Sequence, residues 1–201
     1  MTEPARRLSS RLTLLGLVAL FAAPLAAAFW MYYGTGWRPA GTTNQGTLIE
    51  PVRPLQSLSF ADPATRPAVG KLFTGKWSLV VVGDGACDEA CRTTLVYARQ
   101  TYVGLGRLGT RVQRVLLVPS GCCDQDYLQR EHAGLIVADL NGADAALARG
   151  REALLDAFSG DRRQIFIVDP LGNLMMSYDT RLDPKGLRSD LKKLLDLSHI
   201  G

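Results

Sequence analysis

The sequence has few of the residues on which most catalytic and metal-binding motifs depend. Only two of its 201 residues are histidine, so neither a Ser/His/Asp hydrolase nor a multi-histidine metal centre is expected. The sequence has no Walker motif and no HExxH motif, so neither a P-loop nucleotide-binding protein nor a zinc metalloprotease of the HExxH type is expected. Lys and Arg never form a run of five or more, and the net charge is only +4. We therefore expect no nucleic-acid partner.

Cysteine is also scarce, with four residues in the chain. Four cysteines are too few for a disulfide scaffold in a chain of this length. They lie in two close pairs, Cys87 with Cys91 and Cys122 with Cys123. This arrangement favours a reactive thiol site over cysteines that only cross-link the fold. The hydrophobic content of 47% and the charged content of 21% are typical of one globular domain with a buried core, plus an appendage.

Charged residues are absent between residues 12 and 37. The central part, residues 14–33, is long enough to cross the roughly 30 Å hydrocarbon core as a helix. Three arginines precede it, which favours a cytoplasmic N-terminus. We predict a cytoplasmic N-terminus over residues 1–11, a transmembrane anchor over 12–33, a tether over 34–46 and a folded domain over 47–201.

A cleaved signal peptide is the alternative interpretation of the same segment. Its apolar core would be residues 14–25, and the small residues 26–28 would form the cleavage region. The apolar run continues through the aromatic residues of 29–33, where an interfacial belt would lie, and this favours a retained anchor. We expect a single-pass protein of the cytoplasmic (inner) membrane that contacts the lipid bilayer through residues 12–33. Under both interpretations the domain faces the periplasm, where disulfides can form.

Beyond the tether, the hydrophobic pattern predicts an α/β fold. Residues 47–60 are expected to form short extended segments. Continuous or alternating apolar runs predict strands, and helical spacing of apolar residues predicts helices. This order implies a mixed sheet with helices on both faces. The predicted strands are 78–82, 112–118, 134–138, 164–169 and 173–178, and the predicted helices begin near Cys87 and at 124, 152 and about 187.

Cys87 and Cys91 follow the first predicted strand and are expected to begin a helix, where α/β folds place their sites. A spacing of four residues puts both sulfurs on one helix face. The amides and dipole of a helix N-terminus lower the pKa of a thiol there and raise its reactivity. Two such thiolates could close a disulfide or bind a soft ion such as Cu(I). The alternative is two ordinary core cysteines at helical spacing.

Three segments carry a family resemblance. Residues 77–82 followed by the CxxxC of Cys87 and Cys91, residues 165–172, and residues 47–51 together resemble the Sco/SenC-like proteins, which assist copper-site assembly in cytochrome oxidase. The resemblance implies a thioredoxin-like fold and a periplasmic domain. It also implies copper binding or thiol–disulfide exchange by Cys87 and Cys91, with a cytochrome oxidase copper-site subunit as partner.

The chain departs from this family at the third copper ligand. Sco proteins supply a histidine just before the strand that corresponds to residues 164–168, whereas residues 160–163 here are Gly-Asp-Arg-Arg. The absence of this histidine argues against copper binding in the manner of the family, and any Cu(I) is expected on the thiols of Cys87 and Cys91. The side chains that could assist are Cys122, Cys123 and His132, although His132 is predicted to lie at the surface. Met175 and Met176 are predicted to pack in a hairpin.

These observations predict a membrane-anchored thioredoxin-like protein that assists respiratory cytochrome oxidase assembly. It would deliver copper or reduce copper-ligand cysteines, with Cys87 as the more exposed nucleophile or first ligand and Cys91 as the resolving thiol or second ligand. Cys122 or Cys123 could take part by exchange with this pair. One alternative is a general periplasmic thiol–disulfide oxidoreductase. Another is a non-catalytic tethered interaction domain with a structural disulfide.

Overall fold

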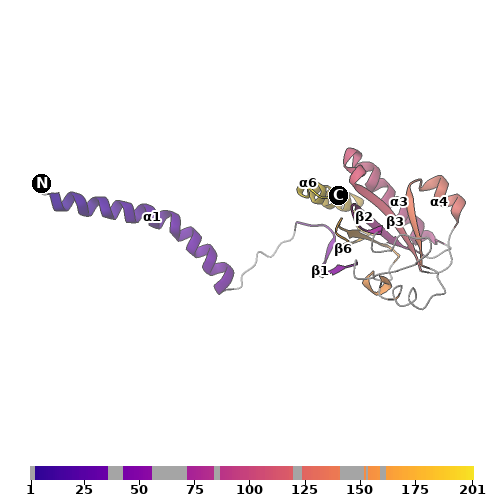
Figure 1. Cartoon of the computed structure of the whole chain (residues 1–201), viewed down its shortest axis with the longest axis horizontal. Coiled ribbons are helices and arrows are strands. Elements are labelled where there is room, and N and C mark those ends of the chain that lie inside the picture. Colours follow the sequence, from indigo (N-terminus) through magenta and orange to yellow (C-terminus); the bar gives the residue numbers. More distant parts are fainter. Residues whose placement is uncertain are drawn as a thin grey trace. The chain divides into compact units, whose positions relative to one another are not determined.

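The computed structural model of the chain describes residues 3–35, 43–55, 72–83, 87–119, 124–140, 152, 154–158 and 162–201. The chain divides into two compact units, Met1–Thr43 and Asn44–Gly201. The first unit contains α1 (Glu3–Gly34), and the second contains the sheet and its helices (Figure 1). The boundaries of the anchor (12–33), the tether (34–46) and the folded domain (47–201) stay predictions.

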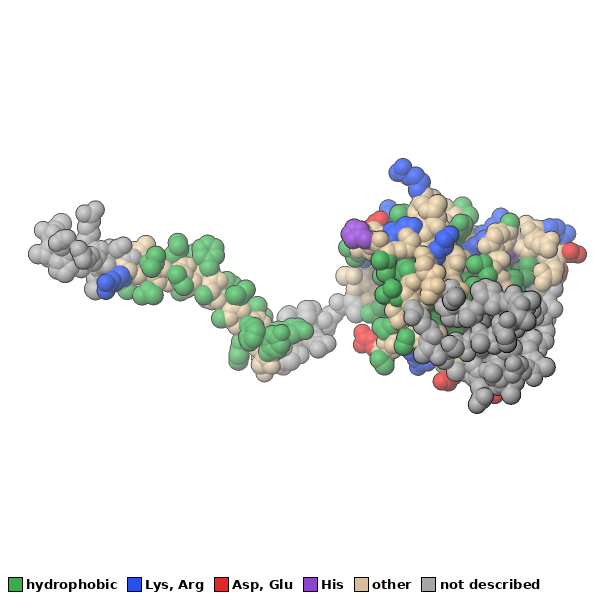
Figure 2. Space-filling view, viewed as in Figure 1, with side chains coloured by type: hydrophobic (Ala, Val, Ile, Leu, Met, Phe, Trp, Pro, Cys, Tyr) green, Lys and Arg blue, Asp and Glu red, His purple; other side chains and the backbone are tan. Residues whose placement is uncertain are grey.

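Helix α1 has the length and composition of a membrane span. Residues Arg11–Gly34 are apolar enough to cross a bilayer, and none of them is buried. Apolar side chains cover this part of the helix in Figure 2. Pro24 lies inside the helix, which is common in membrane helices. The helix thus supports a single-pass membrane anchor.

Six strands of the second unit form one mixed sheet in the order β1-β6-β5-β2-β3-β4. Strands β2, β3 and β4 are parallel, whereas β5, β6 and β1 add to the other side in antiparallel pairing. Strand β2 is buried along its whole length, as expected for a strand that is covered on both faces. The strand bounds are Thr47–Pro54 (β1), Trp77–Val82 (β2), Val112–Val118 (β3), Leu135–Asp139 (β4), Gln164–Val168 (β5) and Asn173–Asp179 (β6).

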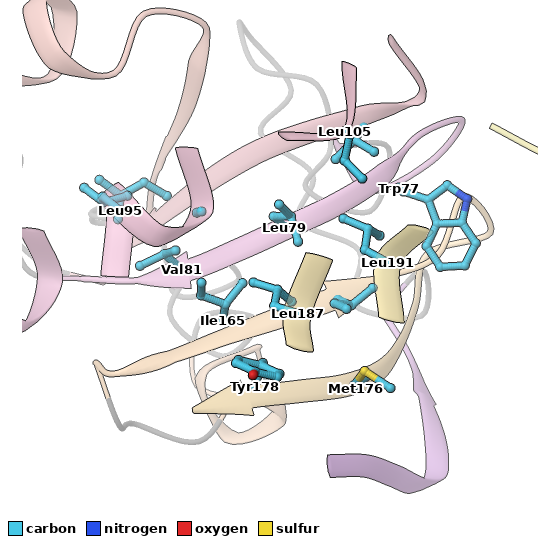
Figure 3. Packing of buried hydrophobic residues seen from close by; sticks show 14 of the residues in the cluster. Trp77, Leu79, Val81, Leu95, Leu105, Ile165, Met176, Tyr178, Leu187 and Leu191 are labelled. Carbon is cyan, nitrogen blue, oxygen red and sulfur yellow. The ribbon is translucent and has the colours of Figure 1, made fainter. Parts of the chain in front are cut away.

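The sheet separates two hydrophobic clusters, because successive strand residues point to opposite faces. Leu79 and Val81 lie in the cluster that α3 and α6 cover, and Val80 and Val82 lie in the other. Figure 3 shows Leu95 of α3 and Leu187 and Leu191 of α6 packed over the first of these faces. Cys87 and Cys91 belong to this first cluster.

The helices agree with most of the predicted ones. Helix α3 is Glu89–Gly104, α4 is Gln125–Glu131 and α6 is Pro184–Leu197, and the 3-10 helix η1 (Gly106–Arg111) follows α3. Residues 154–157 are also helical, in the segment where a helix was expected to begin at residue 152. The helix expected to begin near Cys87 is α3, which starts two residues later, at Glu89.

Strand β6 changes face at Met175. Met176 pairs with Ile167 and Leu174 pairs with Val168, so Met175 is an extra residue between two pairs. Such a bulge reverses the alternation of side chains along the strand. Leu174 therefore packs in one hydrophobic cluster while Met176 packs in the other. Both methionines lie in or against the core, as the predicted hairpin packing requires.

Two polar groups bind the start and the end of the second unit to its helices. Asp190 of α6 is 3% exposed and accepts hydrogen bonds from the backbone N–H groups of Gln45 at 2.6 Å and Gly46 at 2.9 Å. A buried carboxylate with two backbone donors, such as that of Asp190, is satisfied.

Arg111 donates to the carbonyls of four residues near the C-terminus. These four acceptors are Leu195, Ser198, Ile200 and Gly201.

Candidate functional site

Cys87 and Cys91 form a disulfide bond, with their Cα atoms 5.1 Å apart. Cys87 lies beyond the carboxyl end of β2, and Cys91 lies in the first turn of α3. Cys87 is 5% exposed and Cys91 is 0% exposed. Cys87 is thus the more accessible of the two sulfur-bearing residues, but both are buried when the disulfide is closed.

Asp88, between the two cysteines, is the N-cap of α3. Its side chain accepts a hydrogen bond from the backbone N–H of Cys91 at 2.9 Å. Helix amides at this end have no other backbone acceptor, so a carboxylate there ends the preceding loop and starts the helix. Cys87 therefore lies before the helix rather than on its face, which corrects the expectation drawn from the four-residue spacing.

The Asp88 carboxylate also binds a guanidinium from a distant part of the chain. Arg162, just before β5, donates from Nη1 to Oδ2 of Asp88 at 3.0 Å. The bond from Cys91, and secondly Arg162, hold the pKa of Asp88 below its usual value. The segment just before β5 thus brings an arginine next to the cysteine turn. Gly160 and Asp161 lie outside the described residues.

Asp88→Ala is expected to lower the free energy of unfolding by about 0.5 kcal/mol at pH 7, the low end for an N-cap because the side chain is half exposed. Since the folded-state pKa is lowered, the stabilisation is present above the unfolded pKa and is lost as pH falls through the folded value. Urea unfolding of the full chain in detergent should show the difference at pH 7 and none in acid well below pH 3.8. Asp126→Ala, a surface carboxylate of α4, is the control. An equal effect of both changes would contradict the capping role.

Gly83 leaves room for the sulfur of Cys91. A Cβ atom at Gly83 would lie 2.8 Å from Cys91 Sγ and 3.1 Å from Leu116 Cδ1. The backbone N–H of Gly83 donates to Leu117 at 3.0 Å, which keeps the backbone in this close position. The absence of a side chain at residue 83 therefore allows α3 to bring Cys91 against the end of β2.

Arg92 connects Cys87 to α4. Its Nε atom donates to the carbonyl oxygen of Cys87 at 3.1 Å, and its guanidinium carbon lies 4.6 Å from the centre of the Tyr127 ring. The second distance is within the range of a cation–π contact. Arg92 therefore contacts both the cysteine turn and the first helix after β3.

His132 is buried, so its predicted surface position is wrong. It is 1% exposed at the C-terminal end of α4, and its Nε2 atom lies 3.1 Å from the Tyr127 hydroxyl. Its Nδ1 atom has no hydrogen-bond partner among the described residues. Burial, and secondly the charge of Arg114, lower the pKa of His132. The Nε2 edge of the His132 ring is thus in contact with Tyr127.

Cys122 and Cys123 lie outside the described residues, so their participation remains a prediction. Within the described ranges, no group of three or more His, Cys, Asp or Glu side chains could hold a metal ion. The soft donors that the structure brings together are Cys87 and Cys91. Two thiolates suit Cu(I), but no described histidine completes a set with them.

Sequence reasoning did not identify Gly83, Arg92, Tyr127 or Arg162 as neighbours of the cysteines. Asp88 carried a usable signal, since an acidic residue just before an apolar helical pattern is a common N-cap. Gly83, directly after a buried strand, carried a weaker one. The contacts of Arg92, Tyr127 and Arg162 depend on tertiary structure and have no local signal.

Comparison with known proteins agrees with this geometry. Residues 77–198 match the family model described as "Transmembrane-like, thioredoxin-like, C-terminal domain". No curated protein matches the chain. Among solved structures, apo Sco1 from Thermus thermophilus is 20% identical with a TM-score of 0.56, covering 77% of this chain and 99% of that one.

Two further structures have the same fold. Copper-bound yeast Sco1 is 14% identical with a TM-score of 0.53, over 79% of this chain and 96% of that one. BsSco is a Sco-family cytochrome c oxidase assembly protein with a disulfide switch. It is 12% identical with a TM-score of 0.51, and the match covers 78% of this chain and 98% of that one. The predicted mixed sheet with flanking helices is confirmed as a divergent Sco-like thioredoxin fold. Because the family model covers more than half of the sequence, the chain belongs to the family of the transmembrane-like, thioredoxin-like C-terminal domain.

Proposed function

We propose that this protein is a membrane-anchored thiol–disulfide exchange protein that serves cytochrome oxidase assembly. In its reduced form, it would reduce the copper-ligand cysteines of the oxidase copper-site subunit from the periplasmic side of the inner membrane. The observation that carries the proposal is the Cys87–Cys91 disulfide, which is closed at the junction of β2 and α3.

The reaction is a two-step exchange. The Cys87 thiolate attacks one sulfur of the target disulfide, that bond breaks, and the other target sulfur leaves as a thiolate and takes up a proton. Cys91 then attacks the Cys87 sulfur, which releases the second target thiol and closes the Cys87–Cys91 disulfide. Two electrons pass from the pair to the target, and an external dithiol reductant restores the pair.

The local structure supports these roles. Cys87 is the more exposed cysteine and precedes α3, so an incoming sulfur meets it first. Cys91 lies within the first turn of α3, where the helix dipole favours a thiolate. The guanidinium of Arg162 binds the Asp88 carboxylate between the two cysteines, and this pairing offsets the negative charge that Asp88 would otherwise place near a thiolate.

Copper delivery is the second candidate, because copper-bound yeast Sco1 has the same fold. Copper would then be the cargo of Cys87 and Cys91, with Cys122, Cys123 or His132 as further donors. For His132, this requires Tyr127 to give up its contact with the Nε2 atom or a ligand to approach Nδ1.

The full chain in detergent, fully reduced and free of reductant, tests the proposal. It is mixed anaerobically with a disulfide-bonded peptide that copies the copper-ligand cysteine segment of the oxidase subunit. We expect one equivalent of peptide dithiol for each Cys87–Cys91 disulfide formed, measured by alkylation and mass spectrometry. A Cys122→Ser/Cys123→Ser variant should give the same yield if these residues play no part in the first transfer.

The other functions predict different results. Equal rates with an unrelated disulfide peptide would indicate a general oxidoreductase. No transfer, together with a Cys87–Cys91 bond that resists mild reductant, would indicate a structural disulfide. Anaerobic binding of one equivalent of Cu(I), lost in both Cys87→Ala and Cys91→Ala, would support copper delivery.

A further inference from the structure

The backbone at Cys87 has a conformation that few residues adopt. Its φ angle is +40°, and no other non-glycine residue in the described ranges has a positive φ. Side chains other than glycine are disfavoured there because Cβ crowds the following carbonyl. Such a conformation persists only when neighbouring groups hold it. The structure contains two side chains outside the pair that can do so.

We propose that Arg92 and Tyr127 are positioning residues that hold Cys87 in this conformation, so that its sulfur faces Cys91 and the disulfide closes rapidly. This inference rests on the proposed exchange reaction and concerns its second step. The Arg92 side chain reaches back past the start of α3 and donates to the carbonyl of Cys87 at 3.1 Å. That bond fixes the peptide unit that follows the Cys87 side chain.

Tyr127 holds Arg92 in place. Its ring lies under the guanidinium at 4.6 Å, and its side chain packs against the hydrophobic cluster that contains both cysteines. The ring is itself oriented by His132, whose centroid is 5.3 Å away and whose Nε2 lies 3.1 Å from the hydroxyl. A flexible, solvent-facing arginine thus acquires one defined position from a residue anchored in the core.

The expected consequence is a high effective concentration of Cys91 at the Cys87 sulfur. Intramolecular attack depends on how often the reacting atoms are in line. Without the bond from Arg92, the turn that carries Cys87 would sample other backbone conformations. The disulfide would form more slowly, and less of it would be present at equilibrium. No bond other than those of the two-step exchange changes in this scheme.

The experiment measures the Cys87–Cys91 couple in the full chain in detergent. Samples are equilibrated in glutathione redox buffers, and the oxidised fraction is determined by differential alkylation and peptide mass spectrometry. Arg92→Met should lower the equilibrium constant for disulfide formation about tenfold, a factor that corresponds to the loss of one charge-assisted hydrogen bond. Tyr127→Leu should act in the same direction, whereas Tyr127→Phe, which keeps the ring, should change it less than threefold.

Two further variants separate positioning from a general effect on the fold. Arg92→Lys should recover part of the equilibrium constant, because an ammonium can donate to the carbonyl but lacks the planar stacking surface. Arg99→Met is the matched control, since Arg99 lies on the same helix and its guanidinium pairs with the surface residue Glu131 at 3.6 Å. It should leave the equilibrium constant unchanged.

An unchanged constant in Arg92→Met, or an equal loss in Arg99→Met, would overturn the positioning role. Circular dichroism confirms that each variant is folded before it is measured. The glutathione measurement needs no protein target. Failure of the target-peptide assay with a normal Arg92 effect would therefore reject the proposed function alone, and the converse result would reject the positioning role alone.

Discussion

Cys91→Ser is expected to trap the protein in a mixed disulfide with its target peptide, whereas Cys87→Ser should not react. Cys87 is the more exposed residue, and Cys91 lies fully buried in α3. Loss of the resolving thiol stops the reaction after the first attack, because no second thiolate is placed against the Cys87 sulfur. The rate of peptide release should fall by roughly three orders of magnitude, as intramolecular attack is replaced by attack from solution.

The measurement is non-reducing electrophoresis with mass spectrometry of the trapped species. Cys123→Ser is a matched control, because it removes a thiol from the other cysteine pair. A mixed disulfide that forms through Cys91 in the Cys87→Ser variant would reverse the assigned roles. Rapid release in Cys91→Ser that is lost in Cys91→Ser/Cys122→Ser/Cys123→Ser would assign resolution to the second pair instead.

The second large effect is expected at Gly83. Gly83→Ala places a Cβ 2.8 Å from Cys91 Sγ, closer than real contacts allow, and 3.1 Å from Leu116 Cδ1. Overpacking of this kind costs about 1–3 kcal/mol. Because the disulfide fixes the sulfur of Cys91, the oxidised protein has less freedom to relax than the reduced one. We therefore expect a loss of about 2–3 kcal/mol in the oxidised form and a smaller loss in the reduced form.

Urea unfolding of both redox forms provides the test. Gly109→Ala is the control, since Gly109 is also buried but its added Cβ would meet its nearest atom, the Tyr102 carbonyl oxygen, at 3.4 Å. That contact is ordinary, so the control should lose less than about 1 kcal/mol. Equal losses of stability in the two redox forms of Gly83→Ala would mean that Cys91 Sγ is not the atom that excludes a side chain at residue 83.

The strands could be predicted from the sequence because their signal is local. Five of the seven residues 112–118 are apolar, and β3 has these bounds. The C-terminal helix was predicted from a leucine stripe, and Leu187, Leu191 and Leu195 are buried in α6. Patterns of this kind depend on the alternation between core and solvent within one element, so they are visible without tertiary structure.

The surroundings of the cysteines could not be predicted, because three distant segments meet there. Tyr127 comes from α4 and Arg162 from the residues before β5, while Arg92 shares α3 with Cys91. The sequence predicted His132 at the surface, but His132 is buried at the C-terminal end of α4, where it contacts Tyr127. Helix α3 starts two residues after Cys87 because the Asp88 side chain caps the helix at the N–H of Cys91.

The positive φ of Cys87 also bears on how this position can change during evolution. Glycine adopts φ +40° without steric conflict, and asparagine adopts it more readily than most residues. If the thiol had no role, mutational drift would favour these two residues at position 87, and each would relieve the backbone. The cysteine at position 87 runs against this conformational preference of the backbone, which supports the proposed role of its sulfur.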